Sequence, residues 1–218
     1  MTTATAASTA SAAELYGRGL RGSEPRLLLR EEDGHTGLLP IGTYLGPLTT
    51  ADHDVLARAT GPVLDVGCGP GRHVLALARR GVLAVGVDAS PVAVQVARDR
   101  GAAVIHACVF AAVPGAGRWG SALLLDGNIG IGGNPVRLLA RVRALLRTGG
   151  DVLAELEAPG TPMRAGRVRL EGTHSTSDWF AWARVGVDAI DGYADLAGLD
   201  VTQTWEVHGR WFAGLAAR

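Results

Sequence analysis

Three glycines at alternate positions follow an apolar stretch in the run Val63-Leu64-Asp65-Val66-Gly67-Cys68-Gly69-Pro70-Gly71. Glycine lets a backbone turn tightly and approach a ligand without a Cβ clash. About twenty residues later a second apolar run ends in Asp88, whose two carboxylate oxygens suit the two hydroxyls of a ribose. The pattern therefore predicts a nucleotide-binding turn between a strand and a helix.

The glycine spacing separates two classes of cofactor. A dinucleotide fingerprint requires a third glycine at position 72, where this chain has Arg72. The pattern is GxGxG preceded by Asp65, and it resembles motif I of the class I S-adenosylmethionine (SAM) dependent methyltransferases. The resemblance implies a methyltransferase of EC 2.1.1 type, with S-adenosylhomocysteine as product. It also implies that the glycine loop passes beneath the methionine part of SAM and that Asp88 holds the ribose.

The same resemblance names the residues expected to bind SAM, in the glycine loop and after the second, third and fourth strands. They are Asp65, Gly67, Cys68, Gly69, Gly71, His73, Asp88, Ala89, Cys108, Val109 and Asp126. Many of these enzymes have an Asp at the place of Cys108, which accepts a hydrogen bond from the adenine amino group. A thiol is a weak acceptor, so adenine would rely on the Val109 amide. The alternative is that Cys108 only fills space in the core.

A second glycine-rich run, Asp126-Gly127-Asn128-Ile129-Gly130-Ile131-Gly132-Gly133, follows the fourth expected strand. With the rest of the chain it resembles a small bacterial, actinobacterial-type subgroup of these methyltransferases. Ligands in such sheets bind beyond the carboxyl ends of the strands, so we expect Asp126 or Asn128 to contact SAM or the acceptor. The alternative for Asp126 is that it only caps the turn.

Two further residues are candidates for handling the acceptor. Glu157 ends the fifth expected strand, where it could orient an acceptor amine or hydroxyl. His174 lies in a segment expected to cover the site. The catalytic group stays unassigned among Asp126, Asn128, Glu157 and His174. Because the sulfonium of SAM is already a strong electrophile, the protein must chiefly align the nucleophile with the methyl group and exclude water.

Alternating strand and helix patterns predict an α/β fold that positions these loops. Short links between the elements make the first five strands parallel. A closing hairpin completes the seven-stranded, mostly parallel, Rossmann-like sheet that the resemblance implies, with order 3-2-1-4-5-7-6 and helices on both faces. The expected strands are Val63–Val66, Leu83–Val87, Ala103–His106, Ser121–Leu125, Asp151–Glu157, Val201–Val207 and Trp211–Leu215.

The expected organisation is one domain with two additions. Residues 1–13 are small and polar and predict a disordered tail, and residues 14–218 form a single SAM-binding domain. Residues 14–60 predict a helical cap, with one or two short helices between Glu14 and Arg30. Residues 159–177 predict a lid-like insertion that carries several arginines.

Composition limits the partners. The 21 basic and 21 acidic residues balance, which argues against a nucleic-acid partner, and no apolar stretch suits a membrane span. Every basic residue is arginine, which excludes lysine-based catalysis. The two cysteines have no zinc-binding spacing and predict free thiols in a reducing cytoplasm, so we expect no metal. A small-molecule substrate and a cytoplasmic monomer or homodimer follow.

The sequence favours SAM-dependent methyl transfer to an O, N or C nucleophile of a small molecule, with specialised metabolism as the expected setting. One alternative is a non-methylating or repurposed protein with the SAM-binding fold, because Cys108 replaces the usual acid and no base is evident. The other is an NAD-dependent oxidoreductase, against which Arg72 argues.

Overall fold

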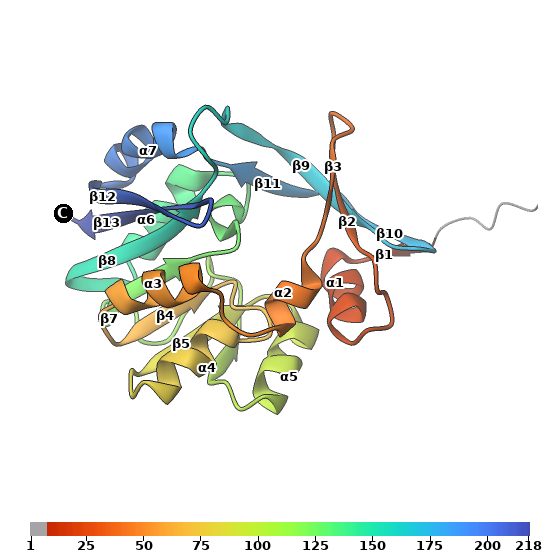
Figure 1. The fold of residues 1–218 in the computed structure, drawn as a ribbon, viewed down its shortest axis with the longest axis horizontal. Helices are drawn as coiled ribbons and strands as arrows, with labels where there is room; N and C mark the ends of the chain where they lie inside the picture. The colour runs from red at the N-terminus through yellow and green to blue at the C-terminus, as the bar shows by residue number, and fades with distance from the viewer. Residues whose placement is uncertain (1–7) are drawn as a thin grey trace, which may run out of the picture.

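The computed structural model describes residues 8–218, and a seven-stranded main sheet forms its centre (Figure 1). Its strands run in the order β6-β5-β4-β7-β8-β13-β12. The first five along the chain are parallel, and β13 is antiparallel to both β8 and β12. This arrangement confirms the predicted order 3-2-1-4-5-7-6. The strands are β4 (Val63–Val66), β5 (Ala84–Asp88), β6 (Val104–His106), β7 (Trp119–Leu124), β8 (Leu146–Leu156), β12 (Leu199–Val207) and β13 (Arg210–Ala217).

Helices cover both faces of the main sheet, as predicted. Residues of α6 and α7 pack in one buried apolar cluster, and residues of α3 and α4 pack in another. Two helix starts are capped by side chains: the Ser90 hydroxyl accepts from the Ala93 N–H, and the Asn134 side chain accepts from the Arg137 N–H. The helices are α3 (Thr50–Arg58), α4 (Arg72–Arg79), α5 (Pro91–Asp99), α6 (Pro135–Arg143) and α7 (Ile190–Ala197), with 3-10 turns η1 (Asn128–Gly130) and η2 (Val187–Ala189).

A second sheet joins the N-terminal region to the insertion after β8 (Figure 1). Its strands run in the order β1-β10-β9-β2-β3, and β11 pairs with β9. Two short helices, α1 (Ala12–Leu20) and α2 (Ile41–Leu45), accompany it. The strands are β1 (Ser8–Ala10), β2 (Leu28–Glu31), β3 (Thr36–Leu38), β9 (Arg164–Glu171), β10 (Ser175–Ser177) and β11 (Phe180–Arg184).

The second sheet corrects the expectation for the N-terminal region. The helical interpretation of Glu14 to Arg30 holds for α1 and is wrong for Leu28–Glu31, which is strand β2. Gly22, with φ +76°, follows the end of α1, and β2 then pairs with β9 about 140 residues away, which local pattern could not reveal. Part of the expected tail is also ordered: Ser8–Ala10 pairs with β10, while residues 1–7 lie outside the described residues.

The insertion at residues 159–177 contains β9 and β10, which are strands of the second sheet. In the described part of the chain, every helix is too short or too polar to span a membrane.

Candidate functional site

A cavity of about 730 Å³ lies between the carboxyl ends of the main-sheet strands and the second sheet. Its floor comes from the main sheet, its walls from the N-terminal helices and its roof from the second sheet. The floor residues include Gly67, Cys68, Gly69, Asp88, Ala89, Asp126, Asn128, Glu155 and Glu157. The walls and roof include Tyr16, Tyr44, Leu29, Leu170, Phe180 and Trp182. The cavity therefore collects most of the residues predicted from the glycine loops.

The glycine loop between β4 and α4 lines the cavity at Gly67 and Gly69, and Asn128 lies against Gly67. A Cβ on Gly69, whose φ is +52°, would stand 2.9 Å from the Tyr16 hydroxyl, so a side chain there would fill the space above the loop. Gly71 has a different role, because a Cβ there would stand 2.7 Å from Cβ of Ala102 on the far side of the loop. The loop thus presents bare backbone to the cavity.

Asp88 ends β5 and faces the same cavity. The Gly69 N–H donates to Oδ2 at 2.8 Å and the Ser90 N–H donates to Oδ1 at 2.7 Å. Burial raises the pKa of Asp88, although these two backbone bonds oppose the rise. Each oxygen can still accept a second hydrogen bond, so the carboxylate can receive two ligand hydroxyls.

Two tyrosines face the floor from the N-terminal helices. Tyr16 and Tyr44 contact each other edge to face with ring centroids 6.4 Å apart, and both line the cavity. Burial raises the pKa of both phenols, and the charge of Asp88 adds to the rise at Tyr16. The hydroxyls therefore stay protonated and can donate hydrogen bonds into the cavity.

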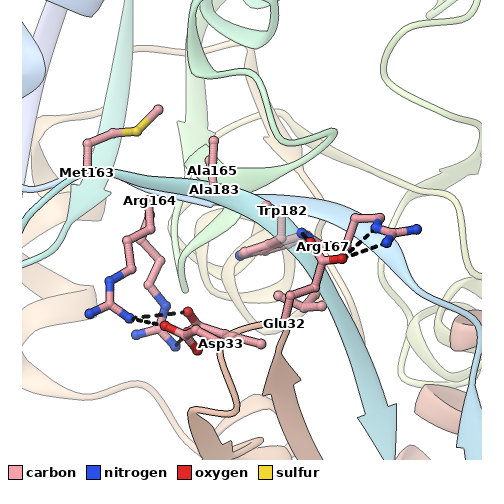
Figure 2. Close-up of a pocket in the computed structure, with 12 residues that line it drawn as sticks. Glu32, Asp33, Met163, Arg164, Ala165, Arg167, Trp182 and Ala183 are labelled. Carbon is pink, nitrogen blue, oxygen red and sulfur yellow. Dashed lines mark hydrogen bonds and ion pairs between the residues drawn. The ribbon is translucent and has the colours of Figure 1, made fainter.

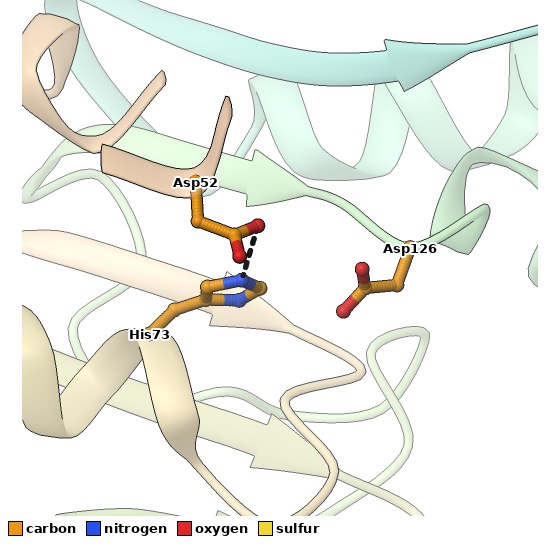
Figure 3. Close-up of side chains that lie close together, drawn as sticks. All are labelled: Asp52, His73 and Asp126. Atoms are coloured by element: carbon orange, nitrogen blue, oxygen red, sulfur yellow. Dashed lines mark ion pairs between the residues drawn. The ribbon is translucent and has the colours of Figure 1, made fainter. Parts of the chain in front are cut away.

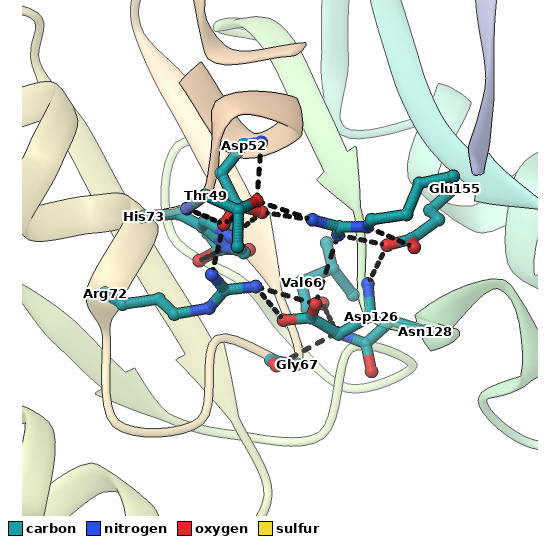
Figure 4. A network of polar contacts seen from close by, with 11 residues as sticks. Thr49, Asp52, Val66, Gly67, Arg72, His73, Asp126, Asn128 and Glu155 are labelled. Carbon is teal, nitrogen blue, oxygen red and sulfur yellow. Dashed lines mark hydrogen bonds and ion pairs between the residues drawn. The ribbon is translucent and has the colours of Figure 1, made fainter. Parts of the chain in front are cut away.

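Two arginines tie together three carboxylates at the edge of the cavity (Figure 4). Arg72 donates to Asp52 at 2.5 Å and to both oxygens of Asp126 at 2.7 and 2.9 Å. Arg210 donates to the other Asp52 oxygen at 2.7 Å and to both oxygens of Glu155 at 2.7 and 2.8 Å. This arginine–carboxylate network joins α3, α4, the loop after β7, β8 and β13.

The network fixes the loop after β7. Asp126 has φ +56°, an uncommon conformation for a residue other than glycine, and its N–H donates to Glu155 at 2.7 Å. The Asn128 amide donates to the carbonyls of Val66 and Gly67 at 2.9 and 3.0 Å. Both residues line the cavity, and both side chains are already hydrogen-bonded within the protein, Asp126 to Arg72 and Asn128 to backbone carbonyls.

Behind the network, His73 lies buried between Asp52 and Asp65, and Figure 3 shows its contact with Asp52. Its Nε2 is 3.5 Å from Asp52 Oδ1 and its Nδ1 is 3.5 Å from Asp65 Oδ2. Burial alone would lower the pKa of His73, but the two carboxylates outweigh it and raise the pKa to about 9. The imidazole is therefore protonated at neutral pH, and the same contacts lower the pKa of Asp52 despite its burial.

Asp52, His73 and Asp126 approach one another closely enough to suggest a metal site (Figure 3). The Arg72 guanidinium, however, bonds to both Asp52 and Asp126. It supplies the positive charge at the place where a cation would stand, so the cluster is satisfied by the chain itself.

Several predicted residues lie away from the cavity lining. Asp65 and His73 sit behind the floor, and neither oxygen of Asp65 has a hydrogen-bond partner among the described residues. Cys108 is exposed, which excludes the core-filler alternative, while Val109 is buried in the core. His174 is exposed in the turn between β9 and β10. These five residues therefore do not line the cavity.

Sequence reasoning missed the residues that the second sheet and the hairpin contribute. Arg210 begins β13, and nothing in its local sequence links it to Asp52, which lies 158 residues away. Tyr16 and Tyr44 stood in a segment expected only to cap the site. A signal was present for Asp52 alone, because Thr49 and Asp52 have the spacing of a helix-capping box, which the structure contains.

The glycine-rich loop after β7 packs on the roof. A Cβ on Gly130 would collide with the carbonyl oxygen of Ala183 in β11, and Ile131 forms an isolated bridge with Trp182. A Cβ on Gly133 would stand 2.9 Å from Cβ of Ala181. Gly130 and Gly133 thus make room for the roof strand.

Comparison with known proteins supports the interpretation of the glycine loop as part of a methyltransferase. Residues 63–150 match the family model described as Methyltransferase domain. The matched segment runs from β4 into β8 and so contains both glycine-rich loops.

Solved structures share the fold over most of this chain. A SAM-dependent methyltransferase from Bacteroides fragilis, crystallised with S-adenosylhomocysteine, is 22% identical and has a TM-score of 0.77 over 97% of this chain and 99% of that chain. A 1,6-didemethyltoxoflavin-N1-methyltransferase from Burkholderia thailandensis is 19% identical, with a TM-score of 0.55 over 77% of each chain. A sugar N-methyltransferase from Streptoalloteichus is 17% identical, with a TM-score of 0.55 over 77% of this chain and 85% of that chain.

Proposed function

Because the chain carries the methyltransferase domain and fold of the class I SAM-dependent methyltransferases, we propose that it transfers the methyl group of SAM to a small molecule. The observation that carries the proposal is the single cavity shared by the bare glycine loop, Asp88 and the loop after β7. We further propose residues 14–218 as one functional unit, with the second sheet as its cover.

The residues on the cavity floor fit SAM. The backbone of Gly67 and Gly69 would hold the methionine part, the free acceptor capacity of Asp88 would take the ribose hydroxyls, and the Tyr16 phenol would close over the loop. Bound SAM supplies an electrophilic methyl carbon. Residues of the floor bind and orient the donor, and the apolar roof excludes water from the reacting atoms.

The acceptor would lie between this floor and the roof. Leu29, Leu170 and Phe180 make the roof apolar and partly aromatic, which favours an acceptor with an apolar body. The names of similar proteins mention nitrogen acceptors on a toxoflavin precursor, a glycopeptide and a sugar. These names support a nitrogen nucleophile on a small molecule as the first acceptor to test.

Among the candidate catalytic residues, Glu157 is the one that we propose to accept a proton from the acceptor. Asp126 is held by Arg72, and the Asn128 amide is used by backbone carbonyls. Glu157 lines the cavity, and its closest cation is Arg184 Nη1 at 3.5 Å, so its carboxylate keeps free acceptor capacity. A protonated amine could therefore lose its proton to Glu157 before attack.

Calorimetric titration of the protein with S-adenosylhomocysteine tests the proposal. We expect saturable binding, weakened at least tenfold by Asp88→Ala and unchanged by Asp99→Ala, which removes an exposed acid of α5. A wild-type protein that binds NADH but not S-adenosylhomocysteine would contradict the proposal and favour an oxidoreductase. Tight binding without methyl transfer to any amine tested would instead favour a repurposed SAM-binding protein.

A further inference from the structure

A second hollow, of about 590 Å³, lies next to the cavity on the second sheet (Figure 2). In the register of this sheet, Trp182 stands opposite Gly166 and Arg184 opposite Arg164. Residues directly opposite each other on antiparallel strands project to the same face. Arg164, Trp182 and Arg184 therefore share one face, and Figure 2 shows Trp182 and Arg164 on the same side of the strands, toward Asp33.

This face is also the one that roofs the cavity. Phe180, Trp182 and Arg184 lie two positions apart along β11, so they project to the same face, and Phe180 lines the cavity. Trp182 and Arg184 line both the cavity and the second hollow. The hollow is therefore a lateral continuation of the cavity beyond Trp182, and a molecule under the roof could extend into it.

Five side chains of alternating charge lead from the cavity into the hollow, in the order Glu157, Arg184, Glu31, Arg164 and Asp33. We call them the charged row. The successive nitrogen–oxygen distances are 3.5, 3.1, 3.6 and 2.8 Å. Glu31 is 13% exposed and forms the floor of the row, while Arg164 is 51% exposed at the outer end. Donors and acceptors thus follow each other along the surface.

Resting on the proposed function, we propose that the hollow is a distal acceptor subsite for a neutral polyhydroxylated group, such as a glycosyl unit. The part that receives the methyl group would lie under the apolar roof, and the hydroxylated part would lie along the charged row. Each hydroxyl both donates and accepts, so it can bond to guanidinium and carboxylate neighbours at once. The Trp182 ring offers an apolar surface for the C–H face of a sugar ring.

The alternation of charge argues against an ionic group in this subsite. An anion beside Arg184 or Arg164 would also stand beside Glu31, and a cation beside Glu31 would stand beside both arginines. Either ion would have to displace an existing ion pair, whereas a neutral polyol adds bonds without separating charges. The subsite therefore selects by hydroxyl pattern rather than by charge.

The test measures binding of simple glycosides to the complex with S-adenosylhomocysteine by saturation-transfer NMR titration. The probes are 4-nitrophenol, its neutral β-D-glucopyranoside, its anionic β-D-glucuronide and its cationic 2-amino-β-D-glucoside. We expect the neutral glucoside to bind about tenfold more tightly than 4-nitrophenol and more tightly than either charged glycoside. Saturation should reach the sugar protons as well as the aromatic ring.

Two variants locate the sugar. Arg164→Gln, which lies outside the cavity, should weaken the glucoside severalfold and leave 4-nitrophenol and S-adenosylhomocysteine unchanged. Trp182→Phe also alters the cavity roof, so it should weaken the glucoside more than 4-nitrophenol. Arg147→Gln and Trp179→Phe serve as controls, because Arg147 is exposed on the main sheet and Trp179 lies outside both linings. The subsite would be overturned if the glucoside bound no better than 4-nitrophenol or if a charged glycoside bound better than the neutral one. It would also be overturned if the variants weakened all probes equally. A wild-type protein that did not bind S-adenosylhomocysteine would overturn the proposed function, and the subsite proposal that rests on it.

Discussion

At the scale of single residues, the buried histidine couples the site to pH. His73 is held between Asp52 and Asp65, and its pKa of about 9 lies above the ordinary value of 6.5. A group whose pKa is raised by folding stabilises the protein fully below the unfolded pKa, and the effect is lost as pH rises through the folded pKa. His73 should therefore contribute about 3 kcal/mol below pH 6.5, lost as the pH rises to about 9.

Chemical denaturation across pH 6 to 10 checks this prediction with His73→Gln. The variant should be less stable than the wild type at pH 6.5, and the difference should shrink toward pH 10. His53→Gln is the control, because His53 is exposed on α3. Identical pH slopes for the wild type and His73→Gln would show that the imidazole is not charged in the folded protein.

Arg210→Met should remove one support of the arginine–carboxylate network. Arg210 is 22% exposed and faces Asp52 and Glu155, so its loss leaves Glu155 without its cation and removes one of the two guanidinium partners of Asp52. We expect a destabilisation of roughly 2 to 4 kcal/mol by urea unfolding. Arg58→Met, which breaks the more exposed Arg58–Asp54 pair, should cost no more than about 1 kcal/mol. Equal losses for the two variants would mean that the network adds nothing beyond a surface ion pair.

At the scale of elements, the roof depends on the glycine-rich loop after β7. Gly130→Ala places a Cβ against the Ala183 carbonyl, so the loop and β11 must separate. We expect a loss of roughly 1 to 3 kcal/mol and faster amide exchange in Phe180–Arg184, with S-adenosylhomocysteine affinity within about threefold of the wild type. Gly192→Ala, in open space on α7, should be neutral or slightly stabilising. Unchanged amide exchange in β11 would show that the roof does not depend on the loop glycines.

Local sequence could predict the elements whose ends and buried faces are determined by residues close together in the chain. The main-sheet strands are apolar runs bounded by glycine turns, and Ser90-Pro91 and Asn134-Pro135 mark helix starts through contacts within three residues. The second sheet lacks such signals. β2 is only partly buried, and it is a strand because β9 offers a partner edge.

The same distinction holds for the candidate site. Asp88 and the glycine loop could be predicted because a strand and the following turn place them by local geometry. Their partners could not, since Arg210 on β13 meets Glu155 on the neighbouring strand β8, and Tyr16 on helix α1 approaches Gly69 from a distant part of the chain. His174 illustrates the opposite error, a residue predicted near the site that lies away from it. It belongs to the insertion that forms the roof, but it lies in an exposed turn between β9 and β10.

At the scale of the whole molecule, ligand binding should stabilise the entire fold, because the cavity is bounded by both sheets. At a concentration of S-adenosylhomocysteine one hundred times its Kd, the folded state should gain about 2.7 kcal/mol. For a chain of this size the midpoint of thermal unfolding should rise by roughly 5 to 10 °C. Differential scanning calorimetry measures the shift, and Asp88→Ala should require a higher ligand concentration to reach it. A shift confined to part of a split transition would indicate that the two sheets unfold independently.

The pairing of β2 with β9 also orders events during synthesis. Arg30 bonds to Glu171, 141 residues later, so the roof cannot close until the ribosome has released most of the chain. The strands around the glycine loop, by contrast, are complete once β7 has emerged. A nascent chain would therefore acquire its donor-binding floor first and carry β2 with an unpaired edge, which makes that short N-terminal strand the segment most in need of protection before release.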